Sequence, residues 1–128
     1  FGEEVKRRIM LGTFVLSSGY YDAYYTKAQK VRRLIQDRTN AILSEYDFVL
    51  TPTTPSTAFD IGVENDDPTA AYLEDIYTVH ANLSGLPAIS LPLWDSKKNM
   101  PIGVQLMAAS FKEKDLFSFS KILMTLKN

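Results

Sequence analysis

Residues 85–93 read GLPAISLPL, a helix stop followed at once by a short apolar strand. Gly85 and Pro87 end the periodic run before them, because glycine takes the left-handed conformation of a helix cap and proline cannot continue a helix. Residues 88–93 are apolar enough for a buried strand and too few for a helix. Two further runs have the same character: residues 48–51 and residues 103–107. The pattern therefore predicts three short strands.

Segments with helical spacing lie before, between and after these strands. Apolar residues recur every three or four positions in four stretches: 3–17, about 21–45, 67 up to the stop at Gly85, and about 114–126. Asp67 and Pro68 suit the N-cap and the first position of the third helix, and Gly19 suits the end of the first. Helices that alternate with short apolar strands predict an α/β layer fold.

Composition places the chain in one broad class. Its 128 residues are 45% hydrophobic, enough for one domain with a core. With 14 basic and 15 acidic residues the net charge is −1, so the overall charge does not indicate nucleic-acid binding. The absence of cysteine and the single histidine exclude disulfides and a His/Cys metal cluster. No apolar run approaches the roughly 18 residues of a membrane span, so we expect a cytoplasmic protein.

The beginning of the chain predicts a larger parent protein. It opens on Phe1-Gly2-Glu3-Glu4, without an initiator methionine, and helical periodicity starts almost immediately. Natural N-termini are more often loose polar tails. Three strands also make a thin sheet for such apolar runs. We therefore expect further strands in a part that precedes this sequence.

Several candidate chemical sites have simpler structural explanations. The only histidine, His80, lies in an apolar-rich helix, where a structural role is the more frequent one. Ser17-Ser18-Gly19 and Ser84-Gly85 lack the G-x-S-x-G frame of a nucleophile elbow and follow helices, where glycine serves as a cap. Residues 64–67, ENDD, lack the ligand spacing of a calcium loop. The lysines and arginines of the long second helix are typical of a solvated face.

Two ionisable residues, Arg8 and Asp75, share helix faces with less polar side chains. The neighbours of Arg8 are Leu11, Gly12 and Val15, and those of Asp75 are Tyr72, Thr78, Val79 and Asn82. A charge on such a face is costly unless it finds a partner. Each residue belongs either to an ordinary ion pair, which periodicity alone favours, or to a site that holds the charged ends of a zwitterionic ligand.

Four runs, which together cover nearly the whole chain, resemble one family. They are residues 1–35, which include LGTFVLSSGYYDAYY and KAQKVR, residues 46–59 (YDFVLTPTTPSTAF), residues 66–92 (DDPTAAYLEDIYTVHANLSGLPAISLP) and residues 101–111 (PIGVQLMAASF). The family is that of the A subunits of glutamyl-tRNA(Gln)/aspartyl-tRNA(Asn) amidotransferases, the glutaminase branch of the amidase-signature enzymes. The first run is specific to this branch, whereas TPTTP and GLPAISLP are shared more widely among amidases.

The resemblance implies that residues 1–128 are the C-terminal portion of an amidase-signature domain, an α/β/α fold with a mixed sheet. The family's Ser–cis-Ser–Lys triad lies upstream of the matching runs, so no catalytic residue and no metal ligand is assigned here. Family members release ammonia from glutamine. A B subunit, which uses ATP and magnesium, then amidates Glu-tRNA(Gln) or Asp-tRNA(Asn), and a C subunit braces the complex.

The resemblance also assigns two substrate-binding residues. The second Arg of the KRR motif is Arg8, which in the family binds the α-carboxylate of glutamine, and the Asp of YLEDIYT is Asp75, which binds the α-amino group. Guanidinium and carboxylate suit those partners. His80 stands where the family most often has proline, so this helix need not be interrupted there.

Two other interpretations stay open. One is a fragment of a different amidase-signature hydrolase, and the other is an independent binding module with no enzymatic parent. For the favoured interpretation we expect a chain that is inactive alone and that self-associates through apolar surface left uncovered by the missing part.

Overall fold

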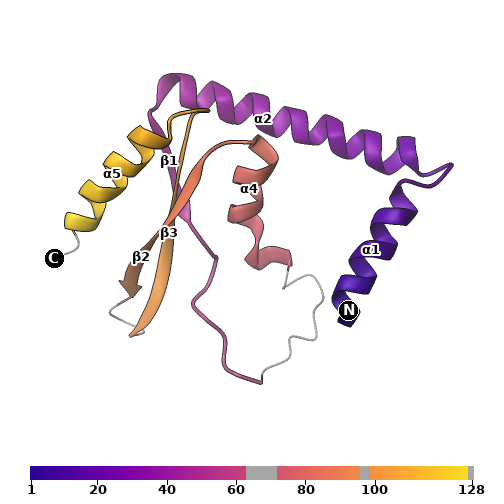
Figure 1. Ribbon diagram of the computed structural model, residues 1–128, viewed down its shortest axis with the longest axis horizontal. Coiled ribbons are helices and arrows are strands. Elements are labelled where there is room, and N and C mark those ends of the chain that lie inside the picture. The colour runs from indigo at the N-terminus through magenta and orange to yellow at the C-terminus, as the bar shows by residue number, and fades with distance from the viewer. Residues whose placement is uncertain (63–71, 96–98, 127–128) are drawn as a thin grey trace. The chain divides into compact units, whose positions relative to one another are not determined.

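The computed structural model describes residues 1–62, 72–95 and 99–126 (Figure 1). The chain divides into two compact units, Phe1–Ile35 and Gln36–Asn128, and each is described by itself. The elements in chain order are α1 (Glu3–Val15), η1 (Tyr21–Thr26), α2 (Lys27–Glu45), β1 (Phe48–Pro52), α4 (Ile76–Ser84), β2 (Ala88–Asp95), β3 (Met100–Ala108) and α5 (Glu113–Thr125). This mixture of helices and a small sheet confirms the α/β class.

The first unit contains α1, the π-helical turn η1 and the beginning of α2. Glu3 and Glu4 lie in the first turn of α1, where the helix dipole favours negative charge. The helix ends two residues before the predicted Ser17, whose hydroxyl donates to the Phe14 carbonyl at 2.7 Å and competes with the helical pattern. Gly19 takes a positive φ of 87°, as expected of a residue that stops a helix.

The long helix predicted from residue 21 begins in a wider, π-helical turn. Tyrosine rings four residues apart pair along it, with centroids 5.9 Å apart for Tyr20–Tyr24 and 4.8 Å apart for Tyr21–Tyr25. These distances are in the favourable range for aromatic pairs. The regular α-helix then runs from Lys27 to Glu45, so the predicted helix is present with a modified first turn.

The predicted apolar stripe of α1 is exposed in the part of the chain that the structure describes. Val5 is 46% exposed, Ile9 55% and Leu16 56%. Contiguous apolar surface of this kind usually marks a contact that another part of a protein makes.

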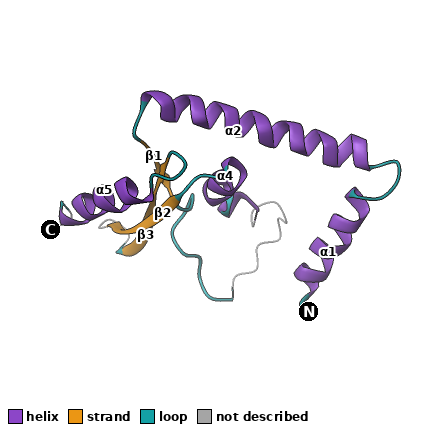
Figure 2. Cartoon of the chain, turned by 45° about the horizontal axis from the view of Figure 1, so that its top comes forward, coloured by secondary structure: helices purple, strands orange, loops and turns teal. Residues whose placement is uncertain are grey.

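The sheet of the second unit has three strands in the order β1-β3-β2, and both neighbouring pairs are antiparallel. Leu106 in β3 faces Leu50 in β1 and Ile89 in β2 in the register. Because side chains alternate along a strand, this register decides which residues share a face. Figures 1 and 2 show α4 and α5 on opposite sides of the sheet.

Each face of the sheet has its own apolar cluster. On the α5 face, Leu106 and Leu116 are 1% and 2% exposed, and the rings of Phe48 and Phe119 stack with centroids 4.7 Å apart. On the α4 face, Met107 packs with residues of α2, β1, α4 and the turn after α4: Leu43, Val49, Ala81 and Leu86. Burial of these side chains holds both helices on the sheet.

The predicted strand boundaries agree with the structure within a few residues, whereas the predicted third helix is interrupted at Asp75 and α4 begins only at Ile76. The predicted strands are extended: 48–51 becomes Phe48–Pro52, 88–93 becomes Ala88–Asp95, and 103–107 becomes Met100–Ala108. Gly85 caps α4 with a φ of 70°, as predicted. The predicted cap at Asp67-Pro68 and the residues of the ENDD segment lie outside the described residues. No helix in the described ranges is long and apolar enough to cross a membrane.

The segment after β1 packs tightly against the sheet at Gly103. A Cβ atom built on Gly103 would lie 2.6 Å from Thr53 Oγ1 and 2.8 Å from Thr53 Cβ, and the Thr53 amide donates to the Gly103 carbonyl at 2.9 Å. Any side chain at this position would displace the segment, because both Thr53 atoms are already within contact distance.

Replacement of Gly103 by alanine should lower the free energy of unfolding by about 1–3 kcal/mol, the usual cost of overpacking. The same substitution at Gly12, where nothing lies within 4 Å of the new Cβ, is the control. Gly12→Ala should stabilise α1 by up to roughly 1 kcal/mol through helix propensity. Urea denaturation of both variants compares them, and equal behaviour would contradict the close approach at Gly103.

Candidate functional site

A band of polar side chains crosses the α4 face of the sheet. Gln105 in β3 pairs in register with Thr51 of β1 on one side and Ser90 of β2 on the other. Residues directly opposite each other on neighbouring strands point to the same face. The three strands therefore place one amide and two hydroxyls in a row across this face of the sheet, next to the apolar cluster around Met107.

Gln105 connects the middle of the sheet to α4. Its side chain is buried, and its Nε2 donates to the backbone carbonyl of Tyr77 at 3.0 Å and, at the longer distance of 3.5 Å, to Thr51 Oγ1. A buried amide without such partners would destabilise the fold. The first turn of α4 is thus tied to the central strand.

Next to this row of polar side chains, Thr53 lies over the central strand β3 and reaches β2. Its Oγ1 lies 2.8 Å from Ser90 Oγ on the far strand, and the bare backbone of Gly103 lies beneath it. Further along the same segment, Ser56 Oγ donates to Glu74 Oε1 at 2.9 Å. The loop that follows β1 is therefore held both on the sheet and at the residue that precedes Asp75.

Asp75 lies between the helical residues 72–74 and α4. Its backbone carbonyl accepts the first helical bond of α4 from the Val79 amide at 2.9 Å. The side chain is exposed, and within the ranges that the structure describes its carboxylate has no hydrogen bond or ion pair. The ordinary ion pair considered for Asp75 is thus not found among these residues.

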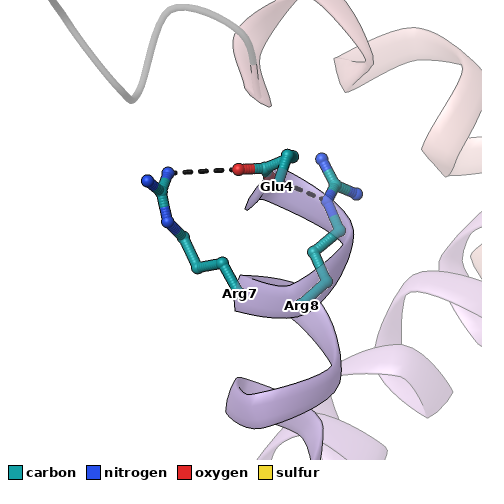
Figure 3. A network of polar contacts seen from close by, with 3 residues as sticks. All are labelled: Glu4, Arg7 and Arg8. Carbon is teal, nitrogen blue, oxygen red and sulfur yellow. Dashed lines mark hydrogen bonds and ion pairs between the residues drawn. The ribbon is translucent and has the colours of Figure 1, made fainter. Parts of the chain in front are cut away.

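Arg8, the other predicted site residue, belongs to the first unit. Its Nε donates to Glu4 Oε1 at 2.9 Å, while the other oxygen of the same carboxylate lies 3.1 Å from a terminal nitrogen of Arg7 (Figure 3). All three side chains are about half exposed or more. Exposed pairs of this kind contribute little stability, so the contact with Glu4 accounts for little of the folding free energy of α1.

His80 has the structural role that the sequence favoured. Its Nε2 lies 2.9 Å from the buried hydroxyl of Thr39 in α2, and that hydroxyl accepts from Ser84 Oγ at 3.3 Å. The Gln36 side chain donates to the Ser84 carbonyl at 3.1 Å. These contacts join the C-terminal half of α2 to α4, and α4 runs through His80 without interruption.

The described residues hold no group of three or more His, Cys, Asp or Glu side chains that could bind a metal ion. A hollow of about 340 Å³ lies where α2, β1, the end of β3 and the start of α5 meet. It is lined by residues such as Glu45, Tyr46 and Lys112, and it includes neither Arg8 nor Asp75. The candidate residues are therefore Arg8 in the first unit and Asp75 in the second, and the polar band lies beneath the helix that follows Asp75.

Comparisons with known proteins place this geometry in context. The family model described as "Amidase" matches residues 1–117. The A subunit of the glutamyl-tRNA(Gln) amidotransferase of Brevibacillus brevis is 62% identical over 113 residues, which are 88% of this chain and 23% of that protein. The chain thus spans about a quarter of the length of the curated relatives it matches.

Solved structures agree with this result. The crystal structure of the A subunit of glutamyl-tRNA(Gln) amidotransferase from Thermotoga maritima is 56% identical and matches with a TM-score of 0.71, covering 91% of this chain and 25% of that one. A 6-aminohexanoate cyclic dimer hydrolase is 27% identical, with a TM-score of 0.60 and coverage of 75% and 23%. The first similarity is much the stronger in sequence.

The contact between His80 and Thr39 gives a stability prediction. Thr39→Val keeps the shape and removes the hydroxyl, which leaves the His80 and Ser84 side chains without this partner, at a cost of about 1–3 kcal/mol. Thr13→Val is the matched control, because the Thr13 hydroxyl is exposed and bonds only within its own helix, to the Ile9 carbonyl. Thermal unfolding should separate the two variants, and equal small shifts would exclude a structural role for the network.

Proposed function

Because this chain belongs to the amidase family, we propose that it is the glutamine-holding part of the A subunit of a tRNA amidotransferase. The observation that carries the proposal is the 62% identity to such a protein, from a glutamyl-tRNA(Gln) amidotransferase, along most of the chain. The relatives are about four times longer than the matched region, so the reaction is that of a larger protein. In that protein the catalytic triad lies outside residues 1–128.

Arg8 and Asp75 hold the two charged ends of glutamine in this proposal. A guanidinium binds a carboxylate through two parallel hydrogen bonds, and a carboxylate accepts hydrogen bonds from an ammonium group. The exposed pair between Arg8 and Glu4 and the exposed Asp75 carboxylate both leave these side chains accessible to a ligand. Together they select an amide substrate that is also an α-amino acid.

The remaining parts of the reaction belong to partners. Ammonia released from glutamine passes to a B subunit, which uses ATP and magnesium to amidate Glu-tRNA(Gln) or Asp-tRNA(Asn), and a C subunit braces the assembly.

The family match over residues 1–117 does not fit an independent module without an enzymatic parent.

A different amidase-signature hydrolase is the second candidate, supported by the similarity to the 6-aminohexanoate cyclic dimer hydrolase. Its 27% identity is less than half of the 62% found for the amidotransferase relative. Glutamine-dependent formation of Gln-tRNA(Gln) by the full complex separates the two candidates, because a simple hydrolase would release ammonia without this product.

Arg8→Ala and Asp75→Ala, each made in the full complex, should raise the KM for glutamine. Both side chains are exposed in this chain, but in the proposal glutamine and the rest of the full protein bury these contacts. Loss of one partner from a buried charge contact costs about 2–5 kcal/mol, which corresponds to roughly a 30-fold or larger increase. Amidation driven by free ammonium should stay nearly unchanged, because it bypasses glutamine. Steady-state kinetics with the two nitrogen donors provide the measurement.

Arg7→Ala is the matched control for Arg8→Ala. Arg7 is the adjacent arginine and contacts the same Glu4 carboxylate, but the proposal gives it no contact with substrate. It should leave the KM for glutamine close to its original value. An equal effect of both arginine variants, or equal loss of glutamine-driven and ammonium-driven activity, would contradict the pocket assignment.

The isolated chain should neither hydrolyse glutamine nor remain monomeric. Without the triad it has no nucleophile for acyl transfer, and the exposed apolar residues of α1 favour association. Ammonia release and static light scattering test the two expectations separately. A measurable glutaminase rate would place catalytic groups inside residues 1–128, and a strictly monomeric chain would argue against an adhesive apolar surface.

A further inference from the structure

Asp75 is flanked by two residues that are tied to other parts of the second unit. The residue before it, Glu74, accepts a hydrogen bond from Ser56 in the loop after β1. Two residues after it, the Tyr77 carbonyl accepts a hydrogen bond from Gln105 in the central strand. We propose that Gln105 and Ser56 are positioning residues that fix the Asp75 carboxylate for the substrate ammonium group. The inference rests on the proposed function.

The contact from Gln105 is the more rigid of the two. Its side chain is only 6% exposed and comes from the strand that has a partner on each side. A methionine would fill nearly the same space without a hydrogen bond, so packing alone does not require an amide at this position. What the amide adds is a directional contact of 3.0 Å with one backbone carbonyl of α4.

The loop that carries Ser56 is also fixed to the sheet. The loop leaves the sheet at Thr53, which is fixed by the Gly103 carbonyl and by the hydroxyl of Ser90. Three residues later Ser56 reaches Glu74 across 18 positions of sequence. The loop is therefore hydrogen-bonded to the sheet at one end and to Glu74, the residue before Asp75, at the other.

The conformation of Asp75 explains why two such contacts are needed. Its φ of −91° and ψ of 0° lie outside the regular helix, at the break between the helical residues 72–74 and α4. Its carboxylate has no hydrogen bond or ion pair within the part of the chain that the structure describes. The contacts of its neighbours are then what hold the carboxylate in place before substrate binds, which is preorganisation of a binding group.

The test compares Gln105→Met, Ser56→Ala and Asp75→Ala in the full amidotransferase. Misplacement of a binding group by about 1 Å can cost up to roughly a hundredfold. We expect Gln105→Met to raise the KM for glutamine about tenfold with little change in kcat, and Ser56→Ala to raise it less. Ser56 is exposed, so its variant should fold normally, and Ser118→Ala on the exposed side of α5 is its matched control.

A second substrate separates positioning from general damage. Glutaramate is glutamine without the α-amino group, so it has nothing for Asp75 to bind. Gln105→Met should leave kcat/KM for glutaramate and the ammonium-driven rate unchanged. In the double variant with Asp75→Ala, the Gln105 substitution should add no further increase in the KM for glutamine, because the group that it positions is gone.

The possible results distinguish the inference from the proposed function. Equal losses with glutamine and glutaramate would overturn the positioning role, as would additive effects in the double variant. A large effect of Asp75→Ala together with no effect of Gln105→Met would overturn the inference and leave the proposed function intact. An unchanged KM for glutamine in Asp75→Ala would contradict the assignment of Asp75 and the inference with it.

Discussion

The hydrogen bond from the buried carboxamide of Gln105 to the Tyr77 carbonyl sets where α4 lies on the sheet. Apolar packing around Met107 is not directional and would allow α4 to slide along the sheet by a small distance. A buried amide tolerates no such freedom, because losing its partner costs more than the bond contributes. Once α4 is fixed at this turn, His80 and Ser84 fall opposite Thr39, and the end of α2 is fixed as well.

Local sequence signals predicted the elements of the fold well, and they failed where a side chain modified the backbone. The GLPAISLPL stretch contains residues that stop a helix, Gly85 and Pro87, and Gly85 does adopt the left-handed cap. Apolar spacing predicts an end of α1 two residues beyond the observed one, because the bond from Ser17 to the Phe14 carbonyl does not follow from that spacing. The π-helical start of the long helix was also missed, since tyrosines four apart suit either helix.

The candidate site was predictable only in part. Arg8 and Asp75 stood out as charges on less polar helix faces, and the family resemblance gave them roles that periodicity could not. The polar band was missed, because Thr51, Ser90 and Gln105 come from three strands whose register no local pattern reveals. The single polar residue in each of these otherwise apolar runs was the available signal. The partner of His80 lies 41 positions away, so the sequence could place the residue in a structural role without naming Thr39.

The close approach at Gly103 also constrains how this sequence can change over evolutionary time. Thr53, Ser90 and Gly103 form one steric and hydrogen-bonded unit, in which the absence of a side chain at Gly103 makes room for the hydroxyl contact between Thr53 and Ser90. A larger residue at position 103 becomes acceptable only with a smaller one at position 53, and Ser90 then loses its partner. A single substitution that enlarges position 103 therefore disturbs both contacts, and related sequences should carry these three positions as a correlated set.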